Sequence, residues 1–235
     1  MSTWLLLDVN NLAYKAYYTT GELSHNGEQT GVLFGLFRDI AFLQERHQTS
    51  NLAFCFDEGP SLRRAAVYQE YKSNRRKEGD RGADELHRQL KEFRDKHLPS
   101  IGHRNIFHVK GYEADDVIAS LCRNLPNRDE ATIISSDRDL YQLLSAKVRI
   151  WNKGRFFTSK TLHDLYGVFP EQWASVKAIA GCQSDFIQGI KGVGENKAIK
   201  YIRDELPRHL KAYEAIASDE GQEIIGMNLI LVELP

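Results

Sequence analysis

Three short apolar segments, each followed by an aspartate, constrain the fold of this chain more than any other feature. They cover residues 4–7 before Asp8, 52–56 before Asp57 and 131–136 before Asp137. Their length and near-continuous hydrophobicity are typical of buried parallel strands, and helical patterns at residues 30–47 and 114–123 separate them. The pattern predicts an α/β fold in which helices flank a parallel twisted sheet.

Aspartates that follow parallel strands meet at one edge of the sheet, where such sheets bind ligands. Further acids lie near the expected ends of strands or the start of a helix. The segment from Gly111 places Glu113, Asp115 and Asp116 ahead of an apolar helical run, and Asp139 lies two residues after Asp137. Helix capping would account for one or two acids at the helix start, but it does not need all three. Taken singly, each acid is more often a solvated cap than a ligand.

Converging carboxylates repel one another unless cations neutralise them. Oxygen ligands favour Mg²⁺ or Mn²⁺ over zinc, and a pair of such ions about 3.5–4 Å apart supports in-line attack on a phosphodiester. A basic stretch provides a matching electrostatic signal, because residues 63–81 carry seven Lys or Arg against three acids. Most such stretches are solvated surface, yet Tyr68, Tyr71 and Arg75 interleave aromatic and cationic groups as a nucleic-acid channel requires.

Composition excludes several classes. The 235-residue chain is 42% hydrophobic with a net charge of −1, so it is globular and its bulk charge recruits no polyanion. Three widely spaced cysteines argue against a disulfide framework, and no apolar run approaches the roughly 18 residues that span a bilayer. We expect a cytoplasmic protein with a core at residues 1–170, an arch or lid at about 76–105, and a helical region at 171–235.

Several sequence blocks, in the same order along nearly the whole chain, carry a resemblance to a known family. They are Asp8-Val-Asn-Asn-Leu-Ala-Tyr14-Lys15, Gln29-Thr-Gly-Val, Phe56-Asp57, Glu70-Tyr-Lys72-Ser-Asn-Arg75, Gly111-Tyr-Glu-Ala-Asp-Asp116, Ser135-Ser-Asp-Arg-Asp139, and Ser184-Asp185 leading to Gly192-Val-Gly194. The chain resembles the structure-specific 5′ nucleases: flap endonucleases and the 5′→3′ exonucleases of phages and of the amino-terminal part of bacterial DNA polymerase I. The resemblance implies a resolvase-like or PIN-like core and a carboxy-terminal helix-3-turn-helix region that binds DNA.

The resemblance also implies roles for individual residues. Those of the first metal site are Asp8, Asp57, Glu113, Asp115 and Asp116, and those of the second are Asp137, Asp139 and Asp185. Lys72 and Arg75 match the pair that reaches the scissile phosphate. Tyr14 matches the aromatic that stacks on the base beside the cut, with an ordinary helix-face core residue as the alternative. Lys15 and Arg64 match phosphate contacts, and Tyr71 is a further candidate for DNA binding.

The glycine turn at residues 189–194 resembles the duplex-binding element of the family, with a plain tight turn as the alternative. Its candidate DNA-binding residues are Lys191, Gly192, Gly194 and Lys197, and its candidate potassium ligands are the backbone carbonyls of Gly189, Ile190 and Val193. Glycines let the backbone approach phosphates closely. Such contacts imply that the protein recognises DNA structure rather than base sequence.

Cys182 is the clearest departure from the family pattern, because it stands where the family has an aspartate. A thiolate is a poor partner for Mg²⁺, so we interpret Cys182 as a lost ligand, with simple packing as the alternative. We therefore expect the protein to need more Mg²⁺ than a relative with all its ligands, or to work better with Mn²⁺.

The sequence thus predicts a divalent-metal-dependent enzyme with 5′→3′ exonuclease and 5′-flap endonuclease activity on duplex or branched DNA, acting in DNA replication and repair. A DNA-junction binder with weak or no cleavage, a PIN-type ribonuclease and a phosphatase with an aspartyl nucleophile are the alternatives. We expect a monomer that binds no membrane, in a bacterial cell or a phage-infected host. RNA of RNA–DNA hybrids is a further expected substrate.

Overall fold

The computed structural model describes residues 2–72 and 81–235, so the predicted catalytic Arg75 lies outside the described residues. The chain divides into two units, each described by itself below. Unit 1 comprises the described residues within Met1–Gly59, Lys77–Asp137 and Trp151–Gly154. Unit 2 comprises the described residues within Pro60–Arg76, Arg138–Ile150 and Arg155–Pro235. The predicted boundary at residue 170 falls within unit 2, and it stays a prediction.

The sheet of unit 1 contains the three predicted parallel strands, which are β1 (Thr3–Asp8), β4 (Leu52–Phe56) and β6 (Glu130–Ile134). A fourth parallel strand is β5 (Ile106–His108). The β1–β4, β1–β6 and β4–β5 pairs are all parallel, with Leu5 opposite Leu52 and Leu7 opposite Ile134. Within unit 1 these four strands have the order β5-β4-β1-β6. The chain also forms β7 (Val148–Asn152) and β8 (Arg155–Phe157). All three strands predicted from apolar segments ending in aspartate are therefore confirmed.

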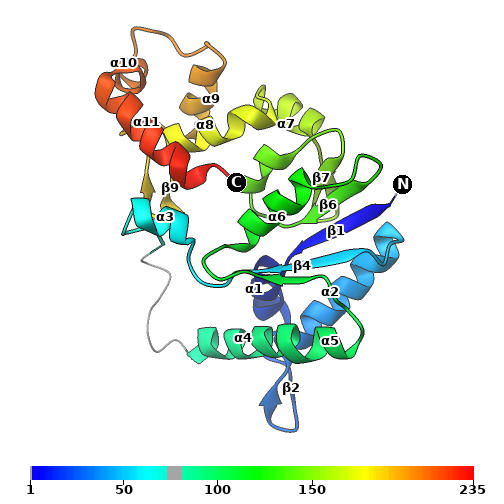
Figure 1. Cartoon of the computed structure of the whole chain (residues 1–235). Coiled ribbons are helices and arrows are strands. Elements are labelled where there is room, and N and C mark those ends of the chain that lie inside the picture. Colours follow the sequence, from blue (N-terminus) through cyan, green and yellow to red (C-terminus); the bar gives the residue numbers. More distant parts are fainter. Residues whose placement is uncertain (1, 73–80) are drawn as a thin grey trace. The chain divides into compact units, whose positions relative to one another are not determined.

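Helices cover the sheet of unit 1 because its strands are apolar on both faces (Figure 1). The helices are α1 (Val9–Thr20), α2 (Gly31–His47), α4 (Arg81–Glu92), α5 (Leu98–Ser100) and α6 (Ala114–Arg123), and a short hairpin pairs β2 (Ser24–His25) with β3 (Glu28–Gln29).

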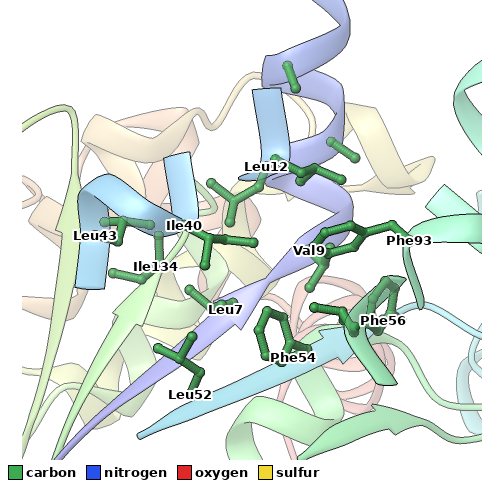
Figure 2. Close-up of a cluster of buried hydrophobic side chains, with 14 of the residues drawn as sticks. Leu7, Val9, Leu12, Ile40, Leu43, Leu52, Phe54, Phe56, Phe93 and Ile134 are labelled. Carbon is green, nitrogen blue, oxygen red and sulfur yellow. The ribbon is translucent and has the colours of Figure 1, made fainter. Parts of the chain in front are cut away.

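One face of the sheet forms the core of unit 1 with α1 and α2. Side chains of alternate strand residues, such as Leu7, Phe54 and Phe56, gather with those of the helices (Figure 2). Cys55 has the opposite orientation because side chains alternate along a strand. It lies near Cys122 of α6. The two faces thus pack against different helices, which explains the continuous hydrophobicity of the strands.

The described part of the predicted arch is helical and is anchored in unit 1. After α4 the chain continues as a π-helical stretch, η2 (Phe93–His97). Leu86, Phe93 and Leu98 are buried in the core of unit 1. Gln89, which is fully buried, accepts hydrogen bonds at Oε1 from the backbone N–H groups of Val32 and Leu33. Because Gln89 satisfies two N–H groups of the first turn of α2, this segment is an integral part of the fold. Its role as an arch stays a prediction.

Unit 2 is mainly helical. Its helices are α3 (Leu62–Val67), η3 (Asp139–Leu143), α7 (Ser159–Tyr166), α8 (Pro170–Ala180), η4 (Gln183–Asp185), α9 (Glu195–Ile202), α10 (Lys211–Ala217) and α11 (Asp219–Val232). A two-stranded antiparallel ribbon joins β9 (Gly181–Cys182) to β10 (Ile187–Gln188).

The core of unit 2 joins α8 and α11 around buried apolar side chains, among them Ala178, Ile187 and Leu231. The buried amide of Asn228 on α11 donates to the backbone oxygens of Ala178 and Gln188. These bonds attach the end of α8 and the β10 strand to α11, so the loop between them is held in place. Among the described residues, none of the helices has the length and apolar character needed to cross a membrane.

Candidate functional site

Asp8 ends β1 and is also the first residue that organises the site in unit 1. Its Oδ1 accepts the N–H of Asn11 at 3.0 Å and so caps α1, while its Oδ2 accepts the hydroxyl of Ser135 at 2.8 Å. Ser135 follows β6, and its Oγ in turn accepts the N–H of Asp137 at 3.0 Å. The ends of β1 and β6 are therefore joined by side chains of the acid-rich motifs.

Asp57 joins the end of β4 to two helix starts. Its backbone N–H donates to Oδ1 of Asn10 on α1 at 3.1 Å, and its Oδ1 accepts the N–H of Ala114, the first residue of α6, at 2.8 Å. The structure thus brings Asp8, Asp57 and Asp137 to the carboxyl edge of the sheet, where the sequence placed them.

Two of the three acids at the start of α6 have a structural role. Glu113 and Asp116 form a capping box, in which the N–H of Glu113 donates to Oδ2 of Asp116 at 3.1 Å. Both side chains are buried. Asp115 is half-buried and stands outside this box. Capping therefore accounts for two acids, and Asp115 is the one that this local structure leaves unexplained.

The negative charges of Asp57 and Asp137 destabilise the ionised form of Asp8. Burial, followed by the negative charge of Asp57, raises the pKa of Asp8 to about 7, with a smaller contribution from Asp137. Hydrogen bonds from Asn11 and Ser135 oppose this increase. A divalent cation would relieve the repulsion, and carboxylate oxygens are the donors that Mg²⁺ and Mn²⁺ prefer. The donor set of unit 1 therefore fits such an ion.

A second cluster, in unit 2, consists of Asp139, Cys182 and Asp185, whose ligand atoms lie within 4.8 Å of one another. Asp139 begins η3, Cys182 directly precedes the short η4 turn and Asp185 is its last residue. The thiol of Cys182 lies 3.6 Å from Oδ2 of Asp185 and 3.0 Å from Oγ of Ser184. Burial, followed by the charge of Asp185, raises the pKa of this thiol, which favours its protonated form.

Lys177 of α8 reaches the same cluster, a feature that the sequence did not single out. Its Nζ lies 2.8 Å from Oδ1 of Asp139, and both side chains are only 16% exposed. In the sequence, the only indication of this role is a single lysine among the apolar residues at the end of α8. The second cluster therefore combines two carboxylates, a thiol and an ammonium group, and this set does not fit Mg²⁺ as well as the set of unit 1 does.

Lys72 is attached to the second cluster through its backbone. Its N–H donates to the carbonyl of Asp185 at 3.2 Å, and its Nζ lies 5.0 Å from the ring centroid of Tyr71. The residue has a φ of 53°, a left-handed conformation that costs a non-glycine residue roughly 1 kcal/mol. Such strain is found most often where function requires it.

The other aromatic and basic candidates divide into buried and exposed groups. Tyr71 is only 7% exposed in the core of unit 2, and Arg64 is buried with its Nε donating to the carbonyl of Leu231 at 2.7 Å. Because they are buried, these two side chains make contacts that stabilise the fold of unit 2. In unit 1, Tyr14 is 46% exposed on α1, which does not favour the core interpretation, and Lys15 pairs with Asp39 at 2.8 Å.

The glycine turn precedes α9 and presents its backbone to solvent. Gly192 has a φ of 77°, and neither Gly192 nor Gly194 has a neighbouring atom that a Cβ would meet within 4 Å. Lys191 is exposed, whereas Ile190 and Val193 are buried. The ammonium of Lys197 donates to the carbonyl of Gly192 at 2.8 Å, so it closes the turn. The predicted potassium ligand Gly189 begins the turn.

Arg138 was also missed by the sequence analysis, although it lies inside a quoted motif. Its guanidinium lies 5.2 to 5.8 Å from the ring centroids of Tyr141, Tyr166 and Trp173. It also pairs with Glu195, the first residue of α9, at 2.7 Å. The residue next to Asp139 is thereby linked to the helix that follows the glycine turn.

Known proteins resemble this chain in sequence. Residues 3–167 match the family model described as 5′-3′ exonuclease, N-terminal resolvase-like domain. The chain is 31% identical over 231 residues to the thermostable DNA polymerase I of Thermus thermophilus, covering 96% of this chain and 27% of the polymerase. It is also 31% identical over 211 residues to a 5′-3′ exonuclease of Bacillus subtilis, covering 85% of this chain and 69% of that protein.

A solved structure shares the fold. The bacteriophage T5 D15 flap endonuclease, in a complex with DNA and metal ions, superposes with a TM-score of 0.82 at 24% identity, covering 99% of this chain and 89% of that chain. This likeness supports a mixed α/β fold with a mostly parallel central sheet flanked by helices. The chain spans only about a quarter of the polymerase relative.

Proposed function

Because the chain belongs to the 5′-3′ exonuclease family, we propose that it is a divalent-metal-dependent 5′ nuclease that hydrolyses DNA phosphodiesters. We assign it 5′→3′ exonuclease and 5′-flap endonuclease activity, with roles in DNA replication and repair. The observation that carries the proposal is the convergence of Asp8, Asp57 and Asp137, in which a buried carboxyl has its pKa raised to about 7 by burial and neighbouring charge.

The cation proposed for unit 1 is Mg²⁺ or Mn²⁺, held by Asp8, Asp57 and Asp115 with the capping pair at the start of α6. Asp137, which the resemblance assigns to the second metal, lies at the same edge of the sheet. When bound, the cation of unit 1 supplies a Lewis acid that polarises the phosphodiester and activates water. Hydrogen bonds within the chain hold the carboxylates that would bind this ion. Asp57 is fixed by the N–H of Ala114, and Asp8 by Asn11 and Ser135, so these carboxylates need little rearrangement when the cation binds.

Lys72 is proposed to stabilise the negative charge that develops on the phosphate in the transition state, as a preorganised cation does. Its left-handed backbone and its N–H hydrogen bond to the carbonyl of Asp185 support this role, because both fix the backbone from which the side chain extends. Arg75 is proposed as its partner from the family resemblance alone, since it lies outside the described residues.

DNA is proposed to contact both units. Exposed Tyr14 of unit 1 provides a stacking surface for a base, and Lys15 lies beside it in the sequence. The open backbone at Lys191, Gly192 and Gly194 suits duplex phosphates, with potassium held by carbonyls of the same turn. The helix-3-turn-helix role of residues 171–235 is part of this proposal. We also propose that the protein acts on the RNA of RNA–DNA hybrids. It is proposed to be a monomer and to act in the cytoplasm.

One observation favours a second candidate function, a junction-binding protein with weak cleavage. The second cluster holds a thiol and an ammonium group where further carboxylates would strengthen metal binding. The two functions share the DNA contacts and differ in whether the phosphodiester is cut.

Cleavage of a 5′-end-labelled flap duplex and of a 3′-labelled blunt duplex, across Mg²⁺ and Mn²⁺ titrations, tests the proposal. Lys72→Ala and Asp115→Asn should each lower the cleavage rate by about 100-fold or more. Lys160→Ala is the matched control, because Lys160 forms an exposed pair with Asp164, and it should cleave like the wild type. Tight binding of the flap without cleavage at any metal concentration would establish the junction-binding function instead.

A further inference from the structure

The ammonium of Lys177 contacts a carboxylate of the second cluster. Its Nζ is 2.8 Å from Oδ1 of Asp139, in a largely buried ion pair. Asp139 is also one of the three residues whose ligand atoms gather within 4.8 Å, together with Cys182 and Asp185. A cation that uses Asp139 as a ligand must therefore share or break its contact with Lys177.

The charges of the cluster favour the resident ammonium. Asp139 and Asp185 contribute two negative charges, the thiol of Cys182 is neutral when protonated, and Lys177 contributes one positive charge. The net charge of these four groups is therefore −1. An aspartate at position 182 would add a negative charge beside the other two carboxylates, so the cysteine and the lysine weaken the attraction for a divalent ion in the same direction.

We propose that Lys177 is the resident cation of the second cluster and that a divalent ion binds Asp139 in competition with Lys177. The inference rests on the proposed function, because it concerns the cations of the same reaction. It predicts a protein that holds one divalent ion firmly, through the carboxylates of unit 1, and a second ion weakly. Lys177 then determines how much metal the reaction requires.

Counting bound Mn²⁺ by electron paramagnetic resonance of the free ion, without DNA, tests this inference. The wild type should show one tight site and one weak site. Lys177→Met should tighten the weak site by about tenfold or more, which corresponds to about 1.4 kcal/mol. Lys177→Arg retains the charge and should keep the weak site, and so should Lys160→Met, which removes an exposed lysine from a pair with Asp164.

Two results would overturn the inference: a wild type that binds two Mn²⁺ ions equally tightly, or a Lys177→Met variant whose second site is no tighter. If Lys177→Met does not fold, Lys177→Gln provides the deciding measurement, because it also removes the positive charge and should tighten the second site about tenfold. An unchanged second site in that variant would then refute the idea. Mn²⁺ binding and flap cleavage are measured separately, so absence of cleavage with the expected binding shift would reject only the proposed function.

Discussion

Replacing Asp8 by asparagine should make the metal-free protein more stable at pH 8 while abolishing cleavage. Asp8 is buried with its two oxygens accepting from Asn11 and Ser135. Asparagine has nearly the same shape, and its carbonyl can still cap α1. The hydroxyl of Ser135 can rotate to accept from the new amide. The substitution therefore removes mainly the negative charge.

The magnitude follows from the pKa of Asp8, which burial and the charge of Asp57 raise from 3.8 to about 7. Between these values the folded state keeps a proton that the unfolded state has released, so stability falls as the pH rises from about 4 to about 7. Each pKa unit corresponds to about 1.4 kcal/mol, which makes about 4 kcal/mol the upper figure at pH 8. Allowing for relaxation around the charge, we expect about 2 kcal/mol, or roughly 4–8 °C in melting temperature.

The measurement is urea or thermal unfolding in a chelating buffer at pH 8 and at pH 5. The stabilising effect of Asp8→Asn should be largest at pH 8 and should shrink at pH 5, where the wild-type carboxyl of the folded protein is protonated. The matched control is Asp129→Asn, because Asp129 is also buried and accepts the N–H of Ser2. A variant that is less stable than the wild type at pH 8, or stabilised equally at both pH values, would refute the reasoning.

Three further predictions use other residues. Cys182→Asp should lower the Mg²⁺ concentration for half-maximal flap cleavage, and an unchanged metal titration would contradict the lost-ligand interpretation. Tyr14→Ala should reduce the single-turnover cleavage rate by about tenfold through lost stacking, with a change in unfolding free energy below about 0.5 kcal/mol because the ring is exposed. In urea unfolding, Arg138→Ala should lower the free energy of unfolding by about 2 kcal/mol and Glu195→Gln by less than about 1 kcal/mol. The difference arises because the Arg138 guanidinium also packs against aromatic rings. Equal decreases for the two variants would contradict a contribution from the rings.

Strands β1, β4 and β6 were predictable because each is short, apolar and ends at or near an aspartate. The predicted helix at residues 114–123 coincides with α6, and the pattern at residues 30–47 matches α2 to within one residue. Local periodicity is enough for such elements. The convergence of Asp8, Asp57 and Asp137 followed from strand topology, because parallel strands end at one edge of a sheet.

The residues that the sequence left out depend on distant contacts. Lys177 stands alone in an apolar stretch of α8, and only the fold reveals that its ammonium reaches Asp139, 38 positions earlier. Tyr71 shows the opposite case, because a basic neighbourhood suggested an exposed ring, whereas the core of unit 2 buries it. Composition along the chain indicates charge, but it does not indicate which atoms face each other.

The capping box of α6 shows why the metal-binding and folding roles of acids in unit 1 must be separated. Glu113 and Asp116 complete the hydrogen bonds of the first turn of α6, so substituting either one perturbs the fold as well as the cluster. Asp115 stands between them without a part in this box. Loss of cleavage in an Asp115 variant of normal stability therefore isolates cation binding, whereas the same loss at Asp116 would not distinguish a missing ligand from an uncapped helix.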